Sequence, residues 1–252
     1  MESQPIRKYV YLGGARKYLE AVREGQSVHG KGFVLGNLEN YLQYLETVGL
    51  PVTARGAAFV GLTKLRDELA ESKSDAKLTR GQATKLGSEM QKLRVTLLSE
   101  AEGKEAFIVT SKRFDVRKLL YAPADLMAPG VFDDLAESLR YDIEEAGKCI
   151  AFERPTAAAF HLMRATEAAV RSLYCAKVKR KRVDPLLWGK MVDHLRKRHD
   201  APPRPLLDGL DNIRHNFRNP TQHPDAIYDI QEAQDLLPLS LDAIGRSVRA
   251  MP

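Results

Sequence analysis

Apolar residues recur every three to four positions along most of this chain, a spacing that places them on one face of an α-helix. In the last third, this pattern predicts five helices in succession, at about residues 131–150, 156–177, 185–201, 205–217 and 224–244. Prolines at positions 155, 202 and 220 fall between them, and proline removes the backbone N–H that a continuing helix needs. The pattern is typical of an all-α bundle.

Several side chains in this bundle are assigned to its core. On the second predicted helix, four apolar residues should face inward: Phe160, Met163, Val170 and Leu173. Trp188, the one tryptophan, is also expected to pack in the core rather than stack on a nucleic-acid base. Cys149 and Cys175 fall inside helical patterns and are predicted to be small core residues rather than a disulfide or a metal site.

The first half of the chain carries weaker signals. Up to Gly36 the sequence is punctuated by glycines, which predicts loop with short elements. Residues 37–48 have the spacing of a helix that Gly49 and Pro51 end. From 54 to 101, narrow apolar stripes on a charged background predict a helical hairpin or coiled-coil-like arm.

The two halves are expected to be separate parts. Phe107–Thr110 is the one short segment of β-like composition, and the prolines and Gly130 that follow it resemble a linker. The fold class is therefore predicted to be all-α. Residues 1–130 would be a mostly helical region for interaction or regulation, and residues 131–252 a helical bundle.

Composition narrows the class of protein. The chain is 44% hydrophobic and 29% charged, as in ordinary globular proteins. No apolar run is long enough to cross a bilayer, and the first residues lack the pattern of a secretory signal. We therefore expect a cytoplasmic protein without a membrane partner.

The net charge of +6 is unevenly distributed. Residues 171–204 hold eleven Lys and Arg against three acids, whereas residues 224–242 hold five acids and no Lys or Arg. One basic run is a candidate RNA contact, and a solvated loop is an equally good interpretation of it: Lys179, Arg180, Lys181 and Arg182. His194 and His199 lie among these basic residues, but no Cys or carboxylate pattern completes a metal site, so neither a metal nor a cofactor is expected.

One short segment near the end of the chain, Arg218–His223, carries the candidate chemistry. An Arg followed after four to six residues by a His occurs three times in this sequence, so the spacing alone says little. Only the copy at Arg218 has Asn directly after the Arg, and it also lies between two predicted helices. In these features the segment resembles the signature of the HEPN superfamily. Residues Ala157–Glu167 resemble a helix that recurs in bacterial HEPN-like proteins, and the likeness extends from Val131 to the chain end.

The resemblance implies a metal-independent endoribonuclease, of a kind that in bacteria serves as a toxin or an antiviral effector. RNA carries its own nucleophile, the 2′-hydroxyl, so cleavage needs proton transfer and stabilisation of the charged phosphate. His223 suits the proton transfer, Arg218 can clamp the phosphate, and Asn219 can position phosphate or ribose without titrating. One such histidine per chain is too few for separate acid and base. A homodimer with a composite site is therefore expected, as HEPN domains characteristically form.

The geometry of the motif depends on Pro220. Residues five apart on an unbroken helix point about 140° apart, so we expect a helix break at Asn219-Pro220 to let Arg218 and His223 converge. A new helix starting near Pro224 would place its dipole beside a bound phosphate. Arg164 and Glu167, three residues apart, are candidates to orient the motif or to form an ion pair with each other.

A non-catalytic interpretation of the motif also remains open. An Arg-Asn that ends a helix near a His is also typical of a helix cap with a surface histidine. The chain would then be a non-catalytic HEPN-like module that binds RNA, a nucleotide or a protein. In either case residues 1–130 could bind a partner or an inhibitor.

Overall fold

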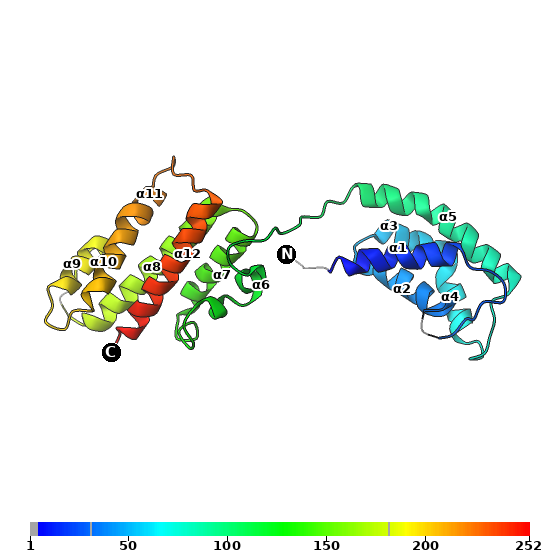
Figure 1. The fold of residues 1–252 in the computed structure, drawn as a ribbon, viewed down its shortest axis with the longest axis horizontal. Helices are drawn as coiled ribbons and strands as arrows, with labels where there is room; N and C mark the ends of the chain where they lie inside the picture. The colour runs from blue at the N-terminus through cyan, green and yellow to red at the C-terminus, as the bar shows by residue number, and fades with distance from the viewer. Residues whose placement is uncertain (1–4, 31, 181) are drawn as a thin grey trace. The chain divides into compact units, whose positions relative to one another are not determined.

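The computed structural model describes residues 5–30, 32–180 and 182–252. Helices dominate these residues, which confirms the all-α fold class; the β pairing found in the described part is an isolated bridge between Ser27 and Lys77. The chain divides into two compact units, Met1–Phe107 and Ile108–Pro252, shown as ribbons in Figure 1. Within the described residues, we find no helix with the length and apolar character needed to cross a membrane.

The first unit is built from helices α1 (Arg7–Glu20), α2 (Val34–Thr47), α3 (Pro51–Phe59), α4 (Leu62–Ala70) and α5 (Arg80–Glu102). Helix α1 packs on α2 and α5, while α3 lies against α2, α4 and α5. All five contribute to one apolar core, whose members include Leu19, Leu38, Tyr41, Ala57, Leu65, Leu86 and Met90.

Two expectations for this unit were wrong. The segment before Gly36 contains the regular helix α1 despite Gly13 and Gly14, because Leu12, Ala15 and Leu19 bury their side chains and offset the poor helix propensity of glycine. Residues 54–101 do not stand apart as the expected helical hairpin or coiled-coil-like arm. Their apolar stripes belong to three helices and are buried in the core of the unit.

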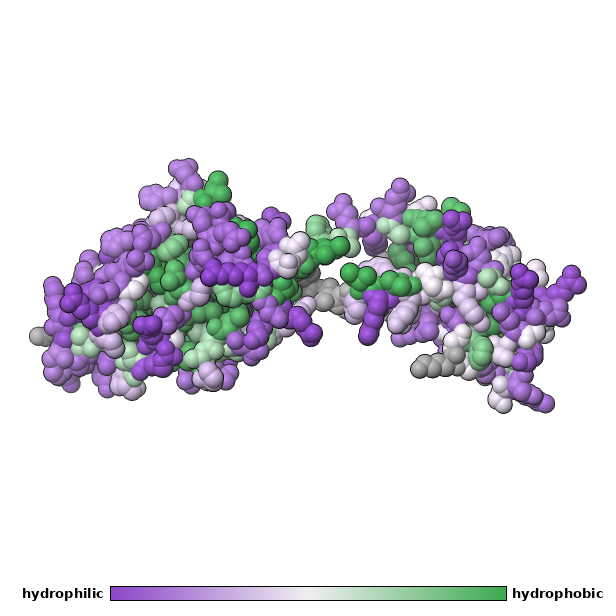
Figure 2. All heavy atoms as spheres, in the orientation of Figure 1, coloured by the Kyte–Doolittle hydropathy of each residue, from purple (hydrophilic) through white to green (hydrophobic). Residues whose placement is uncertain are grey.

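The second unit contains α6 (Val116–Tyr121), the 3₁₀ helix η1 (Pro123–Leu126), α7 (Glu137–Ala151), α8 (Pro155–Lys177), α9 (Trp188–Arg196), α10 (Arg204–Ile213), the π-helical turn η2 (Arg214–Arg218), α11 (Asn219–Thr221) and α12 (Ile230–Arg249). Helix α8 is central, with α7 and α12 packed along it and α9 and α11 also in contact (Figure 1). Hydrophilic side chains cover most of the face seen in Figure 2.

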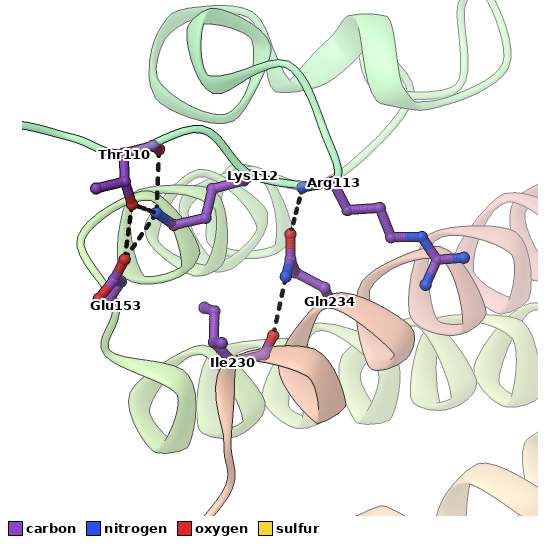
Figure 3. A network of polar contacts seen from close by, with 6 residues as sticks. All are labelled: Thr110, Lys112, Arg113, Glu153, Ile230 and Gln234. Atoms are coloured by element: carbon purple, nitrogen blue, oxygen red, sulfur yellow. Dashed lines mark hydrogen bonds and ion pairs between the residues drawn. The ribbon is translucent and has the colours of Figure 1, made fainter.

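The boundary between the units lies after Phe107, ahead of the division near Gly130 that the sequence suggests. Figure 3 shows the contacts that attach the intervening segment to the second unit. Thr110 Oγ1 and Lys112 Nζ donate to Glu153 Oε1 at 2.8 and 2.9 Å. The backbone N–H of Arg113 donates to Oε1 of Gln234 on α12 at 2.7 Å. Residues 110–113, which precede the expected division near Gly130, are thus held by polar contacts with the bundle.

The β-like segment forms no strand, since Phe107–Thr110 lies outside regular structure and Phe107 is 84% exposed. Among the residues assigned to the core, Met163, Val170, Leu173 and Trp188 are buried, whereas Phe160 is 44% exposed. The buried face of α8 runs through Ala159, Leu162, Met163 and Thr166, and Phe160 lies outside it. Cys149 and Cys175 are free thiols packed at the margin of the core.

Candidate functional site

The segment that carries the motif is a helix with a π-helical turn rather than a helix break. After α10, the turn Arg214–Arg218 leads directly into α11, and the N–H of Asn219 donates to the carbonyl of Arg214, five residues back. Proline clashes with the carbonyl four residues before it in an α-helix, and the wider π turn relieves that conflict ahead of Pro220. The expected break at Asn219-Pro220 was therefore wrong, and the chain leaves the helix only after Thr221.

Arg218 is held against the central helix of the bundle. Its Nε donates to Oε2 of Glu167 on α8 at 3.2 Å, and the two side chains are 26% and 24% exposed. Glu167 also faces Arg171 at 3.7 Å, one helical turn further along α8. The carboxylate of Glu167 therefore fixes the direction of the Arg218 guanidinium.

Arg164 and Glu167 do not pair with each other. Arg164 Nε lies 3.4 Å from Oδ2 of Asp142 on α7, so the two residues reach opposite neighbours. The sequence alternatives were an ion pair within α8 or an orienting role, and the contact with Arg218 favours the orienting role for Glu167. Among the described residues, no contact is recorded between Arg164 and Arg218, Asn219 or His223.

The loop after α11 is anchored at both ends. Thr221 Oγ1 donates to the carbonyl of Phe217 at 2.6 Å and lies 2.7 Å from the hydroxyl of Tyr228. Tyr228 is buried, and its N–H donates to Thr156 Oγ1 on α8 at 3.1 Å. Between these anchors, the N–H of His223 donates to the carbonyl of Pro220 at 2.8 Å. The backbone of His223 is thus fixed in a turn beside α11.

Asn219 and His223 are both exposed to solvent. Among the described residues, no polar contact joins the His223 side chain to Arg218 or to Asn219. The structure brings Arg218 together with Glu167, and the convergence of Arg218 with His223 stays a prediction. The helix expected to begin at Pro224 begins instead at Ile230, where Asp229 and Glu232 form a capping box, so its dipole does not reach His223.

A second histidine, His215, belongs to the same segment and was missed from the sequence. It is exposed on the π turn, three residues before Arg218, and its Nε2 lies 2.8 Å from Arg214 Nη2. The sequence RHNFRN contains it, but a motif defined by the spacing from an Arg to a later His does not include a histidine that precedes the arginine. A homodimer therefore no longer follows from a shortage of histidines in one chain.

A comparison with protein-family models, with curated proteins and with solved structures found no match. The HEPN resemblance accordingly rests on the motif and its helical setting. The activity that it implies is treated below as a proposal.

The basic loop after α8 is solvent-exposed at Lys179, Arg180 and Arg182, and Lys181 lies outside the described residues. Arg182 Nε donates to the carbonyl of Val178 at 3.1 Å. Among the described residues of this loop, none has a recorded contact with the Arg218 segment. Its exposure suits a solvated loop and an RNA contact equally well.

Other titratable residues of the bundle have structural partners. Tyr174 OH lies 2.7 Å from His194 Nδ1 in the core. The Cys149 thiol is partly buried, and this burial raises its pKa above the ordinary value. Arg196 binds Asp208 and Asp211, which ties α9 to α10. In the described part of the chain, no group of three or more His, Cys, Asp or Glu side chains is arranged to hold a metal ion.

Proposed function

We propose that this protein is a metal-independent endoribonuclease of the HEPN type, with Arg218, Asn219 and His223 at its active site. The observation that carries the proposal is the contact between Arg218 and Glu167 beside the π turn. Segments of π-helix occur often at functional sites, and this one presents Arg218, Asn219 and His215 along one short stretch. The anchored loop adds His223 directly after it.

The contact with Glu167 leaves Arg218 with N–H donors that can bind a phosphate. A guanidinium has five N–H donors, and Glu167 takes only the one on Nε. In the described structure the four donors on the terminal nitrogens have no recorded acceptor. A phosphodiester can therefore accept from them bidentately while the carboxylate keeps the plane of the guanidinium fixed.

The proposed reaction is an internal transfer. The 2′-oxygen of a ribose loses its proton and attacks the adjacent phosphorus, the bond from phosphorus to the 5′-oxygen breaks, and that oxygen takes up a proton. The products are a 2′,3′-cyclic phosphate and a free 5′-hydroxyl. His223 serves the proton transfer, Arg218 stabilises the extra charge on the phosphate oxygens, and Asn219 positions ribose or phosphate.

The setting of this activity is also proposed from the resemblance. We expect two copies of the bundle to pair so that their motifs line one site, and the protein to act in the cytoplasm as a toxin or an antiviral effector. The N-terminal unit has its own core, which suits a part that binds a partner protein or an inhibitor.

The test is cleavage of mixed RNA by the purified full-length protein in excess chelator. His223→Ala should lower the rate by about 100-fold or more, the usual contribution of a positioned acid or base. His199→Ala is the matched control, because the His199 side chain is 92% exposed and its recorded partner is the neighbouring Asp200. Undiminished cleavage by His223→Ala would contradict the proposal. Tight binding of RNA without any cut ends would favour the non-catalytic module instead.

A further inference from the structure

A second polar cluster lies between α7 and α8, outside the Arg218 motif. Asp142 on α7 is almost completely buried, with a side chain only 5% exposed. Its Oδ1 lies 2.8 Å from His161 Nδ1 and its Oδ2 lies 3.4 Å from Arg164 Nε, both on α8. A buried carboxylate is costly without partners, and these two side chains supply them.

The contact between Asp142 and Nδ1 of His161 leaves the other ring nitrogen, Nε2, available to a ligand. Because the carboxylate of Asp142 accepts at Nδ1, the proton of a neutral imidazole resides there and the lone pair is on Nε2. Among the described residues, no partner for Nε2 is recorded, and the His161 side chain is 22% exposed. In this neutral tautomer, Nε2 is an oriented hydrogen-bond acceptor on a partly exposed side chain.

An exposed aromatic residue lies beside this acceptor. The ring of Tyr141 stands edge-on to the imidazole of His161, with centroids 6.3 Å apart and planes inclined by 72°. Tyr141 is 54% exposed, so much of its ring surface is free to stack against a ligand.

The outer face of α8 continues from this cluster toward the Arg218 pair. Phe160, expected in the core, is 44% exposed, and the side chains of Arg164 and Arg171 are 64% and 53% exposed. Glu167, the partner of Arg218, lies between the two arginines in sequence, about 4.5 Å along the helix axis from Arg164. Aromatic rings and arginines on one surface are the chemistry that binds single-stranded nucleic acid, by stacking on bases and neutralising phosphates.

We propose that Tyr141, His161 and Arg164 form a binding subsite for single-stranded RNA next to the Arg218 motif. Tyr141 stacks on a base, Arg164 contacts a phosphate, and Nε2 of His161 accepts a hydrogen bond from a ribose 2′-hydroxyl. The last contact gives the site a preference for RNA over DNA, which lacks that donor. The inference rests on the proposed ribonuclease function, because it assigns the subsite to the same substrate.

The experiment measures binding by the full chain in a His223→Ala background, which separates binding from cleavage. Fluorescence anisotropy is recorded with labelled single-stranded RNA and DNA of the same sequence, over a series of salt concentrations. Three variants carry the test: Tyr141→Ala, Arg164→Ala and Asp142→Asn/His161→Ala. The double substitution is used because an amide is less costly than a carboxylate to leave buried without its partner.

Each variant has its own expected result. Tyr141→Ala should weaken RNA binding by about fivefold or more, as expected for the loss of one stacked base. Arg164→Ala should lower the slope of log affinity against log salt by about 1. The double variant should reduce the preference for RNA over DNA by about fivefold.

Two control variants show whether these effects are specific. Tyr121→Ala removes a tyrosine of α6 that is 65% exposed, and it should leave RNA binding unchanged. Asp142→Asn alone separates the loss of the carboxylate from the loss of the imidazole, and the double variant should reduce the preference for RNA further than this single substitution does. Circular dichroism confirms that each protein is folded before it is compared.

The proposal is overturned if the folded variants bind RNA and DNA as the parent does, or if the parent binds neither. It is also overturned if the variants change self-association by light scattering while RNA affinity stays constant, since the surface would then serve a second copy of the chain. These results are independent of the cleavage assay. The ribonuclease proposal fails if His223→Ala still cuts RNA, and the subsite fails on binding alone.

Discussion

Replacing Glu167 by Gln tests whether this carboxylate positions the guanidinium of Arg218. The substitution keeps the size of the side chain and an oxygen that can accept from Arg218 Nε, but it removes the negative charge. The substitution therefore removes the charge interactions of Glu167, of which the one with Arg218 at 3.2 Å is closer than the one with Arg171 at 3.7 Å.

The charges face each other at 3.2 Å with about a quarter of each side chain exposed. At that distance two unit charges attract by about 5 kcal/mol at an effective dielectric constant near 20. The cost of removing both groups from water offsets most of this attraction, so we expect a net loss of about 1 kcal/mol in the free energy of unfolding. A guanidinium that is less well oriented should lower cleavage by about tenfold, equivalent to about 1.4 kcal/mol in the barrier.

The assay combines thermal unfolding with cleavage of one RNA substrate under single-turnover conditions. Glu145→Gln is the matched control, because Glu145 is a partly exposed carboxylate whose ion pair, with Lys148 three residues along, lies within α7. A double-mutant cycle adds Arg218→Ala, after which Glu167→Gln should have little further effect on the rate.

The reasoning would be refuted by a Glu167→Gln protein that matches the Glu145→Gln control in both stability and cleavage rate. Loss of stability with an unchanged cleavage rate would show that the contact only holds the helices together. Additive effects in the double-mutant cycle would show that Glu167 does not act through Arg218.

Two further predictions concern the packing of the second unit. Gly147→Ala should destabilise the protein by about 1–3 kcal/mol in thermal unfolding, because a Cβ there collides with the carbonyl oxygen of Leu119 on α6. Gly81→Ala is the control: a Cβ at this position of α5 meets open space, so the substitution should be neutral or stabilising. Arg196 holds the pKa of Asp208 below its usual range, so their pairing stabilises the fold above about pH 4 and the contribution is lost as the pH falls through the lowered pKa. Arg196→Ala should consequently lower the melting temperature by more at pH 7 than at pH 3, and an equal decrease at both pH values would contradict this interpretation.

Much of the fold follows from local sequence. The bounds of α8 and the burial of Met163 and Trp188 agree with the spacing of apolar residues, because a helix of the bundle must bury one continuous face. The Arg218 segment was also found from sequence, through its asparagine and its helical flanks. Features within a few residues of one another leave such signals.

Glycine and proline misled the sequence interpretation where packing outweighed their local preferences. Helix α1 forms through Gly13 and Gly14 because its buried face contributes more than the glycines cost. The helix around Pro220 continues because a π turn accommodates the ring. Neither outcome can be inferred from propensity, since each depends on neighbours that sequence does not place.

The sequence by itself determined the helical class and most helix positions, and it singled out Arg218 to His223 as the candidate site. Only the tertiary structure decided that Glu167, 51 residues away, holds Arg218, and that Asp142 holds His161 and Arg164. The physical reason is that periodicity fixes which side of a helix is buried, but not the rotation and height at which two helices pack. The rotation and the height decide which polar side chains of two packed helices meet. They therefore also decide which chemical groups the surface presents.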